Sequence, residues 1–150
     1  MRPLRQAAGA LLLWVMLMVQ AAGSDAVQQR EIEYLIDSIA TLHDARFIRN
    51  GTEYDALQAA DHLRLKRRSA GSRVASAEDF ILYCATGSST SGQKYRIRFA
   101  DGRDIEAAVF LRERLAAYRA NDRRASAQRA ASGECPIHEC RLAAVWDRRT

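Results

Sequence analysis

The stretch RFIRNGTEYDALQAADHL, residues 46–63, decides the local fold of this chain. Its first four residues form a short run around Phe47 and end at Asn50-Gly51, a pair that supplies the positive φ angles of a tight turn. Asp55 then stands where a helix N-cap accepts backbone N–H groups. The stretch therefore predicts a short strand, a turn and a helix from Ala56 to about Ala70.

Upstream of this stretch, residues 31–42 have the periodicity of an amphipathic helix. Acidic side chains fall off the apolar stripe, as expected for a helix with one face against a core. The stripe consists of Ile32, Leu35, Ile36, Ile39 and Leu42.

Downstream, Ser76 precedes two acidic residues and predicts the N-cap of a third helix, because acids suit the positive end of the helix dipole. The apolar stripe of this helix is Ala77, Phe80, Ile81 and Cys84, and we expect Cys84 to be a buried free thiol. Residues 95–99 alternate between apolar side chains and arginine, the period of a half-buried strand. A fourth helix is predicted by the apolar side chains of Ile105, Ala108, Val109, Leu115 and Tyr118.

These elements predict an α+β domain over residues 28–118, with about four helices and a small two-stranded antiparallel sheet. Only the runs at 46–49 and 95–99 resemble strands, so we expect them to pair with each other. Residues 119–150 contain few large apolar groups, which predicts a basic, largely disordered tail, with a weak extension of the fourth helix as an alternative for its first part.

The N-terminus predicts export. Arg2 and Arg5 precede an uncharged, mostly apolar run over 7–19 that is too short for the roughly 20 residues of a membrane span, and small residues follow it. We interpret residues 1–23 as a cleaved signal peptide and expect a periplasmic protein without a stable membrane anchor. An uncleaved anchor is the alternative.

The charge distribution argues against a nucleic-acid partner. The formal net charge is +5, but residues 22–118 contain 14 basic and 14 acidic side chains, and the excess lies in the signal segment and the tail. Nucleic-acid binding needs a clustered basic face.

Four motifs occur in order along the predicted domain and together resemble the YfeK-like family of small bacterial periplasmic proteins, a domain of unknown function. The resemblance covers about residues 31–118 and implies an exported α+β domain with no established activity. The motifs are Phe47-x-Arg49-Asn50-Gly51-x-x-Tyr54, Ala59-x-x-His62-Leu63-x-x-Lys66, Ala77-Glu78-Asp79-Phe80-Ile81 and Ser88-Ser89-x-Ser91-Gly92-x-x-Tyr95.

Polar residues of these motifs form the first candidate site. His62 and Lys66 are four apart and share one helix face. With hydroxyls and loop amides nearby, they would hold an anionic or sugar-like ligand through charge-assisted hydrogen bonds. The candidate ligand-binding residues are Arg49, Asn50, Tyr54, His62, Lys66, Ser88, Ser89, Ser91 and Tyr95.

Two other interpretations of this set stay open. In the first, the residues are structural: a turn, core aromatics and satisfied backbone groups. In the second, a serine of the 88–91 loop is a nucleophile with His62 or Lys66 as its base, which requires a hydroxyl within hydrogen-bond reach of that base. The sequence contains no Gly-x-Ser-x-Gly or Ser-x-x-Lys motif, and we assign no catalytic residue.

The second candidate site is the segment Cys135-Pro136-Ile137-His138-Glu139-Cys140. In an oxidising compartment the expectation is a disulfide between Cys135 and Cys140. Metal binding through both thiols and His138 is the alternative.

Taken together, the sequence predicts a non-enzymatic envelope module that binds a partner protein or a small polar ligand and needs no cofactor.

Overall fold

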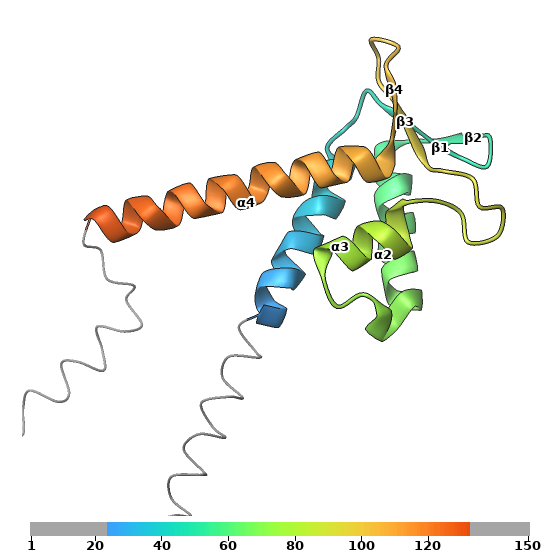
Figure 1. Ribbon diagram of the computed structural model, residues 1–150. Helices are drawn as coiled ribbons and strands as arrows, with labels where there is room; N and C mark the ends of the chain where they lie inside the picture. The colour runs from blue at the N-terminus through green and yellow to red at the C-terminus, as the bar shows by residue number, and fades with distance from the viewer. Residues whose placement is uncertain (1–23, 133–150) are drawn as a thin grey trace, which may run out of the picture. The chain divides into compact units, whose positions relative to one another are not determined.

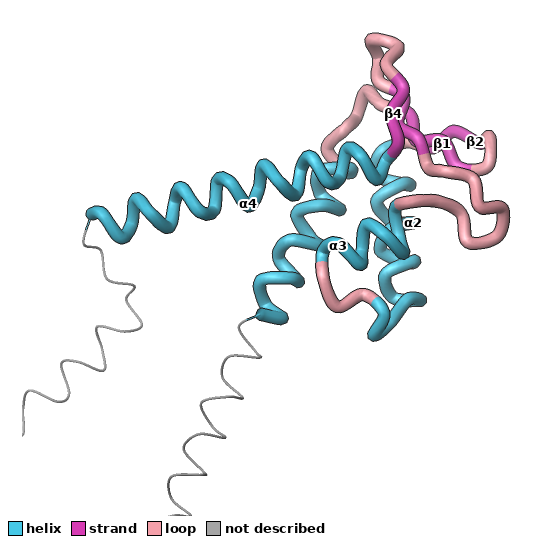
Figure 2. The backbone as a smooth tube through the Cα atoms, in the orientation of Figure 1, coloured by secondary structure: helices cyan, strands magenta, loops and turns pink. Residues whose placement is uncertain are grey.

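The computed structural model describes residues 24–132, of which 24–115 belong to one compact unit and 116–132 to a second. The predicted signal segment, 1–23, lies outside the described residues. The fold class is α+β, as predicted. Helix α2 (Ala56–Ala70) contacts residues 81–85, which continue helix α3 (Ala77–Phe80) (Figure 1). Figure 2 shows the strands grouped at one end of these helices.

The N-terminal helix, described over 24–40, supplies a large part of the core. It begins earlier than the predicted 31–42 and ends two residues sooner, so Leu42 lies outside it, but the rest of the predicted apolar stripe is confirmed. Four of the stripe residues are at most 1 % exposed: Ile32, Leu35, Ile36 and Ile39.

Strands β1 (Arg46–Arg49) and β2 (Thr52–Tyr54) form a hairpin. Its two turn residues have positive φ, 51° at Asn50 and 78° at Gly51, as the Asn-Gly pair predicts. The register pairs Phe47 with Tyr54. Arg49 follows Phe47 by two positions, so both side chains lie on the face of β1 that points toward the helices.

The sheet has four antiparallel strands in the order β2-β1-β3-β4, rather than the two predicted. The predicted pairing is nevertheless present, because β1 pairs with β3 (Arg96–Arg98) in the middle of the sheet. The two strands that the sequence analysis missed, β2 and β4 (Asp104–Glu106), are three-residue edge strands. Segments this short have too few residues to show an alternating pattern.

As a result, one residue lies in a different secondary-structure element from the one predicted. Ile105 was expected in the fourth helix, but it lies in β4 and pairs with Ile97. Helix α4 (Ala107–Ser132) begins directly after this strand. Val109, expected on the apolar side of that helix, is 43 % exposed, whereas Phe110 and Leu111 are buried.

Helix α2 (Ala56–Ala70) has the predicted bounds. Asp55 caps it by accepting the backbone N–H of Gln58 at 2.8 Å, and the Gln58 side chain accepts the N–H of Asp55 in return. Gly71 ends the helix with a φ of 56°, a conformation that glycine adopts without strain, and begins the 3₁₀ turn η1 (Gly71–Arg73). Local signals at its two ends thus set where helix α2, which contains His62 and Lys66, begins and ends.

The third predicted helix is present as α3 (Ala77–Phe80), continued by the π-helical turn η2 (Ile81–Ala85). Ser76 caps it, accepting the Asp79 N–H at 3.1 Å. The predicted stripe is buried, and Cys84 is a free thiol with no exposed surface, as expected. Together with Ile97 of β3, this stripe completes the core against the N-terminal helix.

Residues 119–132 are helical in the structure, as the end of α4, which agrees with a weak extension of the fourth helix. The rest of the predicted tail, 133–150, lies outside the described residues. Most side chains of 116–132 are exposed, so this part of the helix adds little core. Within 24–132, no helix combines the length and the apolar character needed to cross a membrane.

Candidate functional site

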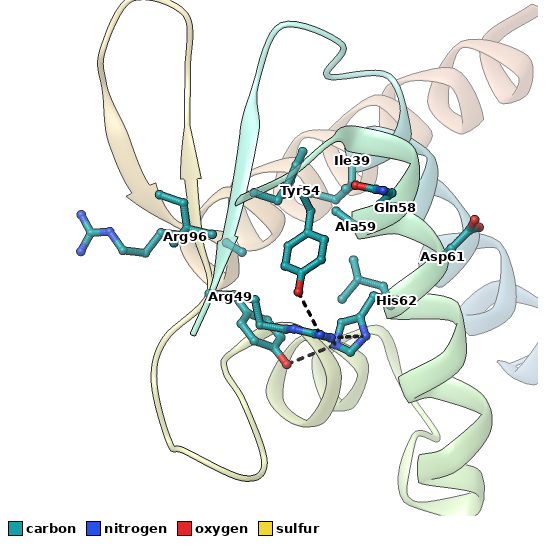
Figure 3. Close-up of a pocket in the computed structure, with 13 residues that line it drawn as sticks. Ile39, Arg49, Tyr54, Gln58, Ala59, Asp61, His62 and Arg96 are labelled. Carbon is teal, nitrogen blue, oxygen red and sulfur yellow. Dashed lines mark hydrogen bonds between the residues drawn. The ribbon is translucent and has the colours of Figure 1, made fainter. Parts of the chain in front are cut away.

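The end of β1 and one face of α2 bring Arg49 and His62 into contact (Figure 3). Arg49 Nη1 lies 2.7 Å from Nδ1 and 3.0 Å from Nε2 of His62, and Arg49 Nη2 donates to the Tyr54 hydroxyl at 3.2 Å. The guanidinium carbon also lies 5.0 Å from the centre of the Tyr54 ring, a cation–π distance. Arg49 is therefore held by two neutral partners from β2 and α2.

His62 is held in its neutral form by these neighbours. Burial lowers its pKa from the ordinary value of 6.5, and the positive charges of Arg49 and Lys66 lower it further. A neutral imidazole has one acceptor nitrogen and one N–H. In the tautomer with Nε2–H, Nδ1 accepts from Arg49 and Nε2–H donates to the Tyr95 hydroxyl, 3.3 Å away, and the 3.0 Å approach of Arg49 to Nε2 is then not a hydrogen bond.

Tyr95, just before β3, connects this pair to Lys66. Lys66 Nζ lies 3.5 Å from the Tyr95 hydroxyl and 5.0 Å from the centre of its ring, and it donates to the carbonyl of Gly87 at 2.8 Å. Burial lowers the pKa of Lys66 and raises that of Tyr95. A Cβ at Gly87 would lie 2.6 Å from the carbonyl oxygen of Gln93, so only glycine fits where the loop closes beside Lys66.

The serine loop makes a separate contact. Ser91 Oγ donates to Asn50 Oδ1 at 2.6 Å, and Asn50 Nδ2 donates to Ser88 Oγ at 3.4 Å, which ties the loop to the β1–β2 turn. Ser89 is exposed. None of the hydrogen bonds found in the described part of the chain joins a loop serine to His62 or Lys66, so no contact supports the serine-nucleophile interpretation.

A pocket of about 380 Å³ opens beside the Arg49–His62 pair. Four of the predicted site residues line it: Arg49, Tyr54, His62 and Tyr95. The other five, Asn50, Lys66, Ser88, Ser89 and Ser91, lie outside its lining.

The apolar wall of this pocket was missed by the sequence analysis. Its residues had the signals of core positions or of a close-packing helix face, and nothing in the chain indicated which of them leave space unfilled. The wall contains Ile39, Phe47, Ile48, Ala59, Leu63 and Ala107.

The cysteine-rich candidate cannot be placed, since Cys135, His138 and Cys140 lie outside the described residues. Over 24–132, no group of three or more His, Cys, Asp or Glu side chains is arranged to hold a metal ion. Burial raises the pKa of the Cys84 thiol, which keeps this side chain protonated and unreactive.

Comparisons with known proteins agree on the family. The chain is 34% identical over 74 residues to the uncharacterized protein YfeK of Salmonella typhimurium, a match that covers 49% of this chain and 62% of the relative, less than two thirds of its length. No solved structure matched the chain. The predicted resemblance is thus confirmed.

A family model described as a family of unknown function (DUF5329) matches residues 26–119, which is more than half of the chain and includes all the residues of the pocket lining. The chain therefore belongs to the DUF5329 family.

Proposed function

We propose that this protein is an exported envelope module that binds a small ligand in the pocket between β1 and α2, without catalysing a reaction. The observation that carries the proposal is the composition of the pocket lining: an apolar wall with a few converging polar groups at Arg49, His62 and Tyr95. Small-molecule sites in proteins have this composition and a volume of about 300–1,000 Å³.

The polar groups are also fixed before any ligand arrives. Arg49 is held by Tyr54 and His62, and His62 is held in turn by Tyr95. A binding site gains affinity when its side chains do not have to be ordered by the ligand. The signal-like segment at 1–23 supports an address in the periplasm, where small polar and amphipathic molecules reach an exported protein.

The test is a thermal-shift screen of the full-length protein against anions, sugars, cell-wall fragments and amphipathic acids, repeated with Ala59→Leu. Ala59 lines the pocket, and a leucine there fills part of the space. We expect at least one compound to raise the Tm of the wild type by several degrees, and Ala59→Leu to lose that shift.

The matched control is Ala127→Leu, the same change at an exposed alanine of α4. It should keep the full shift. A screen in which no compound raises the Tm, or in which every shift survives Ala59→Leu, would contradict binding in this pocket.

A further inference from the structure

The charges of the residues that line the pocket are not all neutralised by ion pairs. Asp61 is paired with Arg64 at 3.0 Å, and Arg96 is paired with Asp104 at 2.8 Å. Arg49 takes part in none of the ion pairs found between residues 24 and 132. The lining therefore has one positive charge without an anionic partner.

The polar end of the pocket also has more donors than acceptors. A guanidinium has five N–H groups, and the contacts of Arg49 to His62 and Tyr54 use only part of them. The Tyr54 hydroxyl accepts from Arg49, and the Tyr95 hydroxyl accepts from His62 and Lys66, so neither hydroxyl proton is used in these bonds. A ligand group that accepts several hydrogen bonds therefore fits here.

Lys66 strengthens this preference without lining the pocket. Its ammonium group contacts the Tyr95 ring and hydroxyl and has no carboxylate partner among the ion pairs of the described residues. Lys66 thus adds positive potential near the acceptor position, but Arg49 is the cation without a carboxylate partner that lines the pocket. Charge of this kind is worth more at a half-buried position than at the surface, because solvent screens it less.

The rest of the pocket lining is mainly aliphatic and aromatic, and the pocket is large enough for a small organic molecule. A cavity of roughly 150 Å³ accommodates benzene, and this pocket has about 380 Å³. Phe47, Ala59 and Leu63 have no hydrogen-bonding side-chain groups, so sugars would lose hydrogen bonds to water along this wall without replacing them.

We propose that the pocket binds a small amphipathic monocarboxylate, with its carboxylate on Arg49 and the Tyr54 and Tyr95 hydroxyls and its apolar body along the wall formed by Phe47, Ala59 and Leu63. This inference rests on the proposed function and names the ligand class. One unpartnered cation in the lining matches a single negative charge, and a planar guanidinium matches a planar carboxylate.

Isothermal titration calorimetry of the full-length protein at pH 7.5 tests the inference with three probes of one chain length: octanoate, octan-1-ol and octyl phosphate. We expect saturable binding of octanoate, at least about tenfold tighter than octan-1-ol, because the alcohol has no negative charge to attract Arg49 and one acceptor oxygen instead of two. Octyl phosphate should bind more weakly than octanoate, since its second charge has no partner in the lining.

Arg49→Gln provides the key variant, and it should weaken octanoate binding at least about tenfold and octan-1-ol binding by a smaller factor. A cooperative urea unfolding transition close to that of the wild type shows that the variant is folded. Arg46→Gln is the matched control, because Arg46 lies on the same strand with an exposed side chain on the opposite face. It should bind octanoate like the wild type.

The outcomes separate this inference from the proposed function. Equal binding of octanoate and octan-1-ol, with both lost in Ala59→Leu, would overturn carboxylate recognition and leave ligand binding in the pocket intact. Tighter binding of octyl phosphate would overturn the single-charge argument. Absence of binding by all three probes would overturn the monocarboxylate, whereas the proposed function fails only if the whole ligand screen also fails.

Discussion

Arg98 and Arg49 belong to the same sheet but lie on opposite faces of it. On the outer face, Arg98 contacts Glu53 at 2.7 Å and Asp104 at 3.5 Å, and its side chain is 48 % exposed. On the face toward the helices, Arg49 contacts the neutral side chains of His62 and Tyr54 and is half-buried. The outer arginine is thus paired with exposed carboxylates, whereas the inner one has no carboxylate partner within residues 24–132.

The comparison shows which of the two arginines has a positive charge available to a ligand. An exposed ion pair contributes little to stability, and its partners are already satisfied. A half-buried cation with neutral partners is costly for a protein to keep, and such groups gather at binding sites. Three predictions, ordered by the size of the expected effect, test how different the two faces are.

The largest effect is expected from Tyr95→Ala on the inner face. Tyr95 is 9 % exposed and its ring contacts both His62 and Lys66, so truncation should lower the free energy of unfolding by about 3 kcal/mol, as for other buried aromatic side chains. Tyr95→Phe keeps the ring and should cost about 1 kcal/mol for the lost hydrogen bonds. Urea unfolding measures both values, and a loss below about 1 kcal/mol for Tyr95→Ala would show that the inner cluster is loosely packed.

A smaller effect is expected from pH. The pKa of His62 is lower in the folded protein than its ordinary value of 6.5, because of burial and of the charges on Arg49 and Lys66. As the pH falls below about 6.5, the unfolded chain therefore takes up the proton first, and the free energy of unfolding decreases until the folded pKa is passed. This contribution is fully present above pH 6.5.

The measurement is urea unfolding at pH 7.5 and at 5.5 for the wild type, His62→Gln and His43→Gln. His43 is exposed, so His43→Gln should keep the wild-type pH dependence, and His62→Gln should lose part of it. Equal pH dependence in all three proteins would mean that His62 is not held neutral by its neighbours.

The smallest effect is expected on the outer face. Glu53→Gln removes the carboxylate that contacts Arg98 across the strands, and it should change the free energy of unfolding by less than about 1 kcal/mol. The change should disappear in about 0.5 M NaCl, since salt screens exposed charges. A loss comparable to that of Tyr95→Ala, or one that persists in salt, would remove the distinction between the two faces.

Much of the fold was predictable because its signals are local. The Asn50-Gly51 turn, the Asp55 and Ser76 caps and the apolar stripe of 31–42 each operate within a few residues. The edge strands β2 and β4 were not predictable, because three residues paired on one side depend on the neighbouring strand for their conformation. Ile105 illustrates this, since its apolar side chain fits a helix stripe equally well.

The candidate site was predictable in part. Residues of its polar cluster were singled out by type and motif, and the structure joins Arg49, Tyr54, His62, Lys66 and Tyr95 through hydrogen bonds. The division between this cluster and the Asn50–Ser88–Ser91 contact was not predictable, because it depends on where a loop closes. The apolar wall was missed for a similar reason, since the side chains that line an apolar pocket are of the same types as those that fill a core.

The sequence by itself determined the turns, caps and helix faces of this protein, because each depends on the chemistry of neighbouring residues. Only the tertiary structure decided that Arg49 faces inward, that its partners are neutral and that a pocket lies beside it. Those properties follow from the distances between segments far apart in the chain, namely β1, α2 and the residue before β3. Whether a positive charge is neutralised depends on such distances, because Coulomb attraction and burial are set by what packs around the charge and not by its place in the sequence.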